Sequence, residues 1–393
     1  MNAQDTPHAP RLLRGGVELF AALIRAFDAA QQEVLLETYI FDFGGAGADV
    51  AHALMRAAQR GVRVCVVVDG VGTGVLPPAW AQEFTQAGVQ CRLYSPLAGL
   101  GFWLPSRWRR LHRKLCVVDQ SVAFCGGINI LDDFLSSSPP DRLAHPRLDY
   151  AVSLRGPLVQ KAHDTMTQLW SRMEAVRELR SQDIAGAPDA LRSADQDLKL
   201  PARGTVQLVL RDNVRHRVQI EHAYRKALAS ARHDVIVASA YFFPSLRLRR
   251  ALVLAARRGV RVRLLLQGQY EYFVPYRASR QLYGKLLASG VEIYEYHASV
   301  LHAKVAVVDG HWATVGSSNL DPFSLLLARE ANVVVRDETF AHALQDSLCQ
   351  AMQTGAMRVD PQTFAHRPAW ERLVDWAASM VLRFGVFLTG KRY

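Results

Sequence analysis

Five residue types that handle phosphate groups and protons recur in this chain at one fixed spacing. The sequence LHRKLCVVDQSVAFCGGIN occupies 111–129 and LHAKVAVVDGHWATVGSSN occupies 301–319, so each member of the second copy lies 190 positions after its counterpart. The paired members are His112 and His302, Lys114 and Lys304, Asp119 and Asp309, Gly126 and Gly316, and Asn129 and Asn319. A repeat kept only for packing has no reason to preserve histidine, lysine and asparagine, so the recurrence indicates two copies of a functional site.

These residue types together indicate phosphoryl chemistry. A neutral histidine can attack phosphorus or carry a proton near neutral pH, and lysine is a compact cation suited to a phosphate oxygen. Each His-x-Lys opens an apolar run of strand character, 114–118 and 304–308, where alternation puts both side chains on one face. The glycines allow close backbone approach, and the asparagines can donate hydrogen bonds to an oxyanion. One copy therefore predicts half of a phosphate-binding site.

The frame resembles the signature of the phospholipase D superfamily, which is His-x-Lys, four residues, Asp, six residues, Gly with Gly or Ser, a spacer and Asn. Both copies match it without a gap. Over residues 10 to 365 the chain also looks like the bacterial cardiolipin synthases of the B type. The stretches that carry this second resemblance include LLETYIF, RGVRVCVVVDG, RDNVRHR, ASAYFFP and HWATVGSSNLDP.

The resemblance implies a two-step mechanism and a role for each motif residue. His112 forms a covalent phosphohistidine and His302 acts as general acid and base, although the sequence alone does not rank two nearly equivalent frames. Ser317 can assist, but its counterpart is Gly127, so both copies cannot use a hydroxyl there. The phosphate oxygens are held by Lys114, Lys304, Asn129 and Asn319. No cofactor is expected, because the intermediate retains the energy of the phosphodiester bond.

Each histidine needs an acidic residue to orient its second ring nitrogen. In the superfamily this residue lies downstream of the motif, which points to Glu330, 28 positions after His302. The matching candidate for His112 is Asp149, 37 positions after it. We therefore expect Glu330 to pair with His302 and Asp149 with His112.

Asp119 and Asp309 complete the motif. By resemblance they belong to the catalytic set, but we interpret them as more structural than catalytic, because each directly follows a predicted strand. Aspartate at such a position commonly fixes a turn and does nothing else.

The elements around the motifs repeat as well. VLLETYIF, ADVAHALMRAAQRG and VRVCVVVDG in the first half correspond to VIVASAYFF, LRLRRALVLAARRG and VRVRLLLQG in the second, a β-α-β series in each. Gly88 and Gly290 fit the C-terminal caps of further helices. We predict an α/β fold of two repeated phospholipase D-like lobes, each a mixed β-sheet flanked by helices. The resemblance implies a pseudo-twofold axis between them, with both motifs at the seam.

The domain boundaries follow from composition. Residues 181–204 lose apolar periodicity and collect Asp, Ala, Ser, Pro and Gly, which is typical of a linker. We expect a first lobe at 1–180, this linker, a second lobe at 205–360 and an amphipathic tail at 361–393.

Two segments suggest contact with a membrane. The first half carries about 12 extra residues before its motif, in YSPLAGLGFWLPSRWRR, where aromatic residues alternate with arginines as they do at an anionic bilayer interface. A surface loop packed on the core, or a site for single-stranded nucleic acid, would use the same residues. The apolar and basic residues of this segment that could make such contacts are Phe102, Trp103, Leu104, Arg107, Trp108, Arg109 and Arg110.

The tail is the second such segment. RPAWERLVDWAASMVLRFGVFLTGKRY places Trp370, Leu373, Val374, Ala377, Val381 and Phe384 at helical spacing. We favour an anchor lying in the membrane plane, with a helix docked on the protein body as the alternative.

Charge and cysteine usage restrict the partners and the compartment. The net charge of +11 favours an anionic partner, either nucleic acid or a membrane surface. Five cysteines without metal-ligand spacing indicate reduced thiols, and no apolar stretch reaches the length of a membrane span, so we expect a peripheral protein at the cytoplasmic face of the bacterial inner membrane. A lysine beside each histidine would repel a cation, so we expect no metal and activity in chelator.

The resulting hypothesis is a phosphatidyltransferase. It joins phosphatidylglycerol to the headgroup hydroxyl of a second polar lipid and releases glycerol, giving cardiolipin. A phospholipase D-type hydrolase and a nucleic-acid phosphodiesterase stay open as alternatives, and the sequence leaves the acceptor lipid and the oligomeric state undetermined.

Overall fold

The computed structural model describes residues 9–96, 108–135, 142–181, 205–212, 218–269, 272–322 and 328–388. The first part of the chain forms a seven-stranded mixed sheet in the order β1-β8-β7-β6-β2-β3-β4. Its strands are β1 (Arg11–Arg14), β2 (Glu33–Thr38), β3 (Arg63–Asp69), β4 (Gln90–Tyr94), β6 (Lys114–Val118), β7 (Val122–Gly126) and β8 (Tyr150–Arg155). Its helices are α1 (Gly15–Ala29), α2 (Gly45–Gln59), α3 (Pro78–Ala87) and α4 (Pro157–Ser181).

The second part repeats this order strand for strand as β9-β15-β14-β13-β10-β11-β12, with β16 (Ala356–Arg358) added beside β12. Its strands are β9 (Val206–Arg211), β10 (Asp234–Ser239), β11 (Arg261–Gln267), β12 (Glu292–Tyr296), β13 (Lys304–Val308), β14 (Trp312–Gly316) and β15 (Ala328–Val335). Its helices are α6 (Gln219–Ser230), α7 (Leu246–Arg257), α8 (Phe273–Leu287) and α10 (Glu338–Gly355). The predicted fold of two repeated α/β lobes is confirmed.

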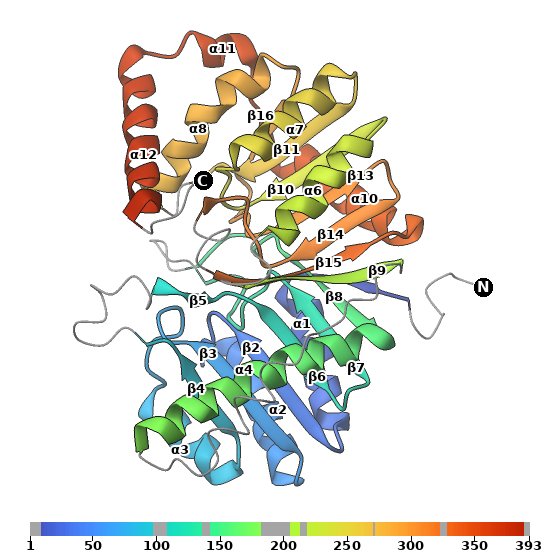
Figure 1. The fold of residues 1–393 in the computed structure, drawn as a ribbon, viewed down its shortest axis with the longest axis vertical. Coiled ribbons are helices and arrows are strands. Elements are labelled where there is room, and N and C mark those ends of the chain that lie inside the picture. The colour runs from blue at the N-terminus through green and yellow to red at the C-terminus, as the bar shows by residue number, and fades with distance from the viewer. Residues whose placement is uncertain are drawn as a thin grey trace.

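The two lobes meet along a seam at which the ends of their sheets join (Figure 1). The short strand β5 (Arg110–Leu111) of the first lobe pairs in parallel with the start of β15, Leu111 opposite Arg329. In the reciprocal position, Leu148 of the first lobe forms a parallel bridge with Leu301 of the second. These two parallel pairings between the lobes are equivalent, as a pseudo-twofold relation between the lobes requires.

Three apolar clusters hold the molecule together. One lies under α1, α2 and α3 in the first lobe, and a second lies under α6, α7 and α8 in the other. The third is shared, because side chains of β6 and β13 pack there with α4 and α10, for example Val117, Val305, Trp170 and Leu344. Burial of this shared cluster keeps the lobes together, since apolar area removed from water is the main favourable term in folding.

Local signals place the helix ends largely as the sequence predicts. Gly88 caps α3 with a φ of 88°, a left-handed conformation that glycine adopts without strain. Gly290 has a φ of 86° but lies beyond Ala288, which is the C-cap of α8. The glycine therefore turns the chain toward β12 and is not itself the cap.

Two predicted segments lie largely outside the described residues. They are the linker after Ser181 and most of the aromatic and basic insert, of which residues 94–96 and 108–110 are described. The tail forms the short helix α11 (Pro361–Ala365) and the long helix α12 (Ala369–Leu388). No described helix combines the length and apolarity needed to cross a membrane.

Candidate active site

The seam brings the two motif histidines together. His112 lies between β5 and β6, and His302 lies two residues before the start of β13, at the equivalent point of the other lobe. The backbone N–H of His112 donates to the carbonyl of Arg329 at 3.0 Å, and that of His302 donates to the carbonyl of Leu148 at 2.9 Å. Each histidine is thus fixed by a backbone segment of the opposite lobe.

The carboxylates that orient the histidines are exchanged between the lobes. His112 Nδ1 lies 3.0 Å from a carboxylate oxygen of Glu330, and His302 Nδ1 lies 2.6 Å from Asp149 Oδ2. Both acidic residues were identified from the sequence, but the expected pairing within each half is wrong. The reason is the reciprocal pairing at the seam, which carries each carboxylate past its own motif and beside the other lobe's histidine.

The surroundings favour neutral imidazoles. Burial lowers the pKa of His112, against the opposing charge of Glu330. Burial, together with Lys304 and Lys114, lowers the pKa of His302 well below its usual range. Because a carboxylate accepts from Nδ1–H of each ring, the Nε2 lone pair is the one available for reaction. The arrangement therefore offers two neutral imidazoles in one site.

Asp149, which orients His302, has a raised pKa. Its side chain is buried, and burial raises the pKa of Asp149 to about 6 despite the nearby Lys304, whose Nζ is 3.8 Å from Asp149 Oδ2. A perturbed acid and base in contact inside a pocket are characteristic of active sites.

The two lysines lie behind the histidines. Lys114 Nζ donates to the carbonyl of His112 at 3.0 Å, and Lys304 Nζ donates to the carbonyl of His302. Both side chains are buried, and burial followed by the charge of Lys304 lowers the pKa of Lys114 to about 7. The sequence predicted direct contact with phosphate oxygens. In the described structure neither lysine is among the residues that line the central cavity, and their contact with phosphate oxygens stays a prediction.

The two asparagines do line that cavity. Asn129 Oδ1 accepts from the backbone N–H of Ile40 at 3.2 Å, which leaves its amide NH2 as the group that can donate. Asn319 Oδ1 is buried with no hydrogen-bond partner among the described residues. Both residues are placed as the sequence predicts for groups that contact phosphate oxygens.

Ser317 supports Glu330 and does not face the cavity. Its hydroxyl donates to Glu330 Oε2 at 2.5 Å and accepts from the backbone N–H of Ala331 at 3.1 Å. At the equivalent Gly127, a Cβ atom would come within 2.4 Å of Asp149 Oδ1. Glycine is therefore required in the first lobe because the Asp149 carboxylate occupies the space that a serine side chain would need.

Asp119 and Asp309 lie at the opposite ends of β6 and β13 from the histidines. Asp119 accepts from the backbone N–H groups of 31–33, and Asp309 accepts from those of 232–234, each at 2.8–2.9 Å. Both residues have a positive φ, near 50°. They fix the turn after each motif strand and lie a strand length from the imidazoles, which supports the interpretation that they are more structural than catalytic.

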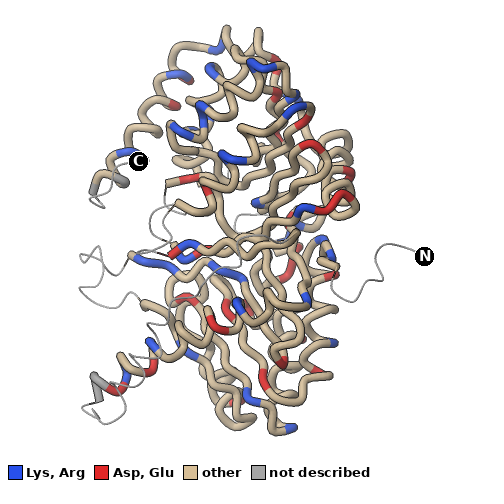
Figure 2. The backbone as a smooth tube through the Cα atoms, turned by 45° about the vertical axis from the view of Figure 1, so that its right-hand side comes forward, with Lys and Arg blue, Asp and Glu red and all other residues tan. Residues whose placement is uncertain are grey.

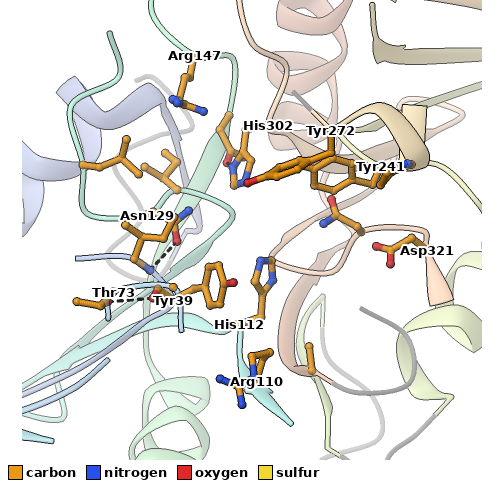
Figure 3. Close-up of a pocket in the computed structure, with 18 of the residues that line it drawn as sticks. Tyr39, Thr73, Arg110, His112, Asn129, Arg147, Tyr241, Tyr272, His302 and Asp321 are labelled. Carbon is orange, nitrogen blue, oxygen red and sulfur yellow. Dashed lines mark hydrogen bonds and ion pairs between the residues drawn. The ribbon is translucent and has the colours of Figure 1, made fainter. Parts of the chain in front are cut away.

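A cavity of about 670 Å³ contains both histidines (Figure 3). Its wall includes side chains from both lobes that the motif analysis missed: Tyr39, Thr73, Asp133, Arg147, Tyr241, Tyr272 and Asp321. The rings of Tyr39 and His112 have centroids 4.9 Å apart, and those of Tyr241 and Tyr272 are 6.1 Å apart. Tyr39 directly follows β2, and Tyr241 is the second residue after β10. These two strands neighbour the motif strands, and that position was the available signal.

Arg110 also forms part of this wall. Its guanidinium bonds Asp69 at 3.1 Å, and the same carboxylate accepts from the backbone N–H of Leu111 at 2.7 Å. The sequence grouped Arg110 with a membrane-facing insert, and this is wrong, because the ion pair with buried Asp69 directs its side chain inward.

Among the described residues no cluster of three or more His, Cys, Asp or Glu side chains is arranged to hold a metal ion.

Comparison with known proteins agrees with this geometry. A family model described as "Cardiolipin synthase, PLD-like domain" matches residues 23–137 and 224–352. Cardiolipin synthase B of Escherichia coli K12 is 38% identical over 385 residues, which cover 97% of this chain and 89% of that protein. The corresponding protein of Salmonella typhimurium LT2 is 37% identical over the same lengths.

Solved structures share the fold. Phosphatidylserine synthase of Haemophilus influenzae superposes with a TM-score of 0.69 over 97% of this chain and 93% of that one. Polyphosphate kinase of Porphyromonas gingivalis gives 0.56 over 98% of this chain and 55% of that one. Each is 12% identical in sequence, so these likenesses concern the fold alone.

Proposed function

Because the chain belongs to the cardiolipin synthase family of PLD-like proteins, we propose that it transfers a phosphatidyl group from phosphatidylglycerol to the headgroup hydroxyl of a second phospholipid. The products are cardiolipin and glycerol. The observation that carries the proposal is the pair of carboxylate-bound, neutral histidines that the two lobes contribute to one cavity.

In the first step, His112 Nε2 attacks the phosphorus of phosphatidylglycerol. A P–N bond forms, the P–O bond to the glycerol headgroup breaks, and His302 gives its proton to the departing glycerol oxygen. The entering phosphodiester anion counters the lysine charges that depress the pKa of His302, and this allows His302 to carry that proton. Glu330 stabilises the positive charge that His112 acquires.

The second step reverses these roles with a new alcohol. His302, now neutral, takes the proton of the acceptor lipid's hydroxyl, whose oxygen attacks phosphorus. The P–N bond breaks and His112 is regenerated. The amides of Asn129 and Asn319 hold the non-bridging oxygens, and the buried ammonium groups of Lys114 and Lys304 supply positive charge from behind.

The location that we propose is the cytoplasmic face of the bacterial inner membrane, where the protein is peripheral. A basic chain is attracted to the anionic lipids of that surface. The five cysteines are free, and three are buried, which suits a reducing compartment.

The test is incubation of the purified protein with vesicles of labelled phosphatidylglycerol, with and without EDTA, beside His112→Ala. We expect labelled cardiolipin and free glycerol in both buffers, and neither product from the variant. Phosphatidic acid as the only product would identify a hydrolase and contradict transfer. No turnover of lipid, with cleavage of single-stranded DNA instead, would identify the nucleic-acid phosphodiesterase.

A further inference from the structure

Helix α12 is fixed to the second lobe by one face. Asp375, on that face, is fully buried and forms ion pairs with Arg277 of α8 at 2.8 Å and with Arg367 at 2.9 Å. Ala378 and Leu382 pack into the apolar cluster under α8. A buried carboxylate with two arginine partners is costly to expose, so the helix cannot roll to bury its opposite side.

That opposite side is apolar and exposed. Trp370, Leu373, Trp376, Met380, Val381, Phe384 and Phe387 are each between 44% and 73% exposed. At 100° per residue these seven side chains fall within an arc of about 140°, on the side of the helix away from Asp375. We call this set the outer face of α12. Soluble proteins seldom leave so large a contiguous apolar patch in water unless it binds something.

Two features indicate what covers the outer face. Arg372 and Arg383 are exposed, and both project along one edge of the same arc. Figure 2 shows only isolated charged residues along α12, with uncharged residues over most of its length. A row of aromatic and aliphatic residues bordered by arginines matches a bilayer interface, where the rings enter the headgroup layer and the guanidinium groups meet lipid phosphates.

Helix α12 also lies beside the active site. Leu382, on the inner side of α12, lines the cavity that contains both histidines. Tyr272 and Phe273, at the start of α8, are 58% and 54% exposed, and Tyr272 lines the same cavity. One helix therefore contacts the cavity with one side and presents apolar residues to solvent with the other.

We propose that the outer face of α12 is the surface by which the protein lies on an anionic phospholipid bilayer, with α12 parallel to the membrane plane beside the cavity. This inference rests on the proposed function, because it supplies the route by which membrane lipids reach the histidines. It also combines the two interpretations of the tail. In this proposal α12 docks on the protein body with one face and binds the membrane with the opposite face.

The experiment uses the full chain and vesicles of phosphatidylglycerol with phosphatidylethanolamine. The test variant carries Leu373→Glu, Val381→Glu and Phe384→Glu. The matched control carries Leu246→Glu, Leu254→Glu and Met357→Glu, three exposed apolar residues away from α12 with the same change in charge. Sedimentation measures vesicle binding. Turnover of short-chain phosphatidylglycerol below its micellar concentration measures the active site without a membrane.

We expect the test variant to bind vesicles at least about tenfold more weakly, and the control within about twofold of the unmodified protein. Both should turn over monomeric short-chain lipid normally. Unchanged vesicle binding by the test variant would overturn the inference, and so would equal losses on vesicles and on monomeric lipid. Vesicle binding through α12 without any cardiolipin formation would instead contradict the proposed function alone.

A second measurement avoids new charges. Tryptophan fluorescence of the unmodified protein should be quenched by vesicles containing brominated lipid, and the variant Trp370→Phe with Trp376→Phe should lose most of that quenching while still binding. Equal quenching in both proteins would contradict insertion of α12. A lipid-free dimer that the test variant disrupts and the control does not would show that a second copy covers this face, and would also overturn the inference.

Discussion

The exchange of carboxylates between the lobes is the main feature at the scale of residues. Glu330 lies 28 positions from His302 yet binds His112, and Asp149 binds His302. Separation along the chain suggested the opposite pairing, because it contains no information about the parallel contacts at the seam. Neither lobe alone holds a histidine together with its orienting acid.

Replacing Glu330 by Gln tests this exchange. Glu330 raises the pKa of His112 against burial, so Glu330→Gln should lower the pKa of His112. Because diethylpyrocarbonate reacts with the neutral imidazole, His112 of the variant should then react at lower pH than in the unmodified protein. The rate is measured for each histidine by peptide mass spectrometry. His302 should keep its profile, and Asp149→Asn should give the reverse pattern. A changed profile at His302 in Glu330→Gln would contradict the assignment.

The pH dependence follows from Asp149, whose pKa burial raises to about 6. Above that pH the carboxylate is ionised and accepts from His302 Nδ1–H, whereas below it the carboxyl is protonated and the orienting contact is lost. On the acid side, we expect kcat/KM to fall tenfold per pH unit well below about 6. A flat profile down to pH 5 would be inconsistent with this role.

At the scale of elements, much of the fold could be predicted. The two motif strands occupy 114–118 and 304–308 as the apolar runs predict, and the β-α-β repeats appear in both halves. The motif could not show which members face the substrate. A five-residue strand separates His112 from Asp119, so the two residues mark opposite ends of one element.

Asp309 should therefore contribute to stability more than to catalysis. Its carboxylate accepts three backbone N–H groups, and these lower its pKa although burial opposes them. We expect Asp309→Ala to reduce the free energy of unfolding by about 1–3 kcal/mol, and Asp309→Asn to reduce it less, because Asn keeps an acceptor and tolerates a positive φ. Urea unfolding gives these values. Loss of kcat in a folded, stable Asp309→Asn protein would restore the residue to the catalytic set.

At the scale of the whole molecule, the sequence predicted two lobes but not how they interlock. The repeat identifies equivalent elements, whereas the contact of Leu111 with Arg329 and of Leu148 with Leu301 depends on the three-dimensional docking of two sheets. Tyr272 and Arg147 belong to neither motif, and the docking of the two lobes brings them to the cavity. The sequence therefore did not identify them.

This interlocking predicts that the chain tolerates a cut between its lobes. A protease site placed within 182–204 should yield two fragments that stay associated and active, because the shared apolar cluster and the seam pairing hold them. Gel filtration followed by the cardiolipin assay measures both properties. Separation of the fragments, or association without activity, would mean that the linker itself maintains the site.

The central claim is transfer through a histidine that both lobes help to position. Its most direct test is a single-turnover reaction with phosphatidylglycerol labelled at phosphorus, stopped at successive times to measure label bound to protein. We expect protein-bound label to rise and then fall as cardiolipin appears, to be released by acid as a P–N bond is, and to be absent in His112→Ala. Cardiolipin formed without any protein-bound label, or label retained in His112→Ala, would contradict the account.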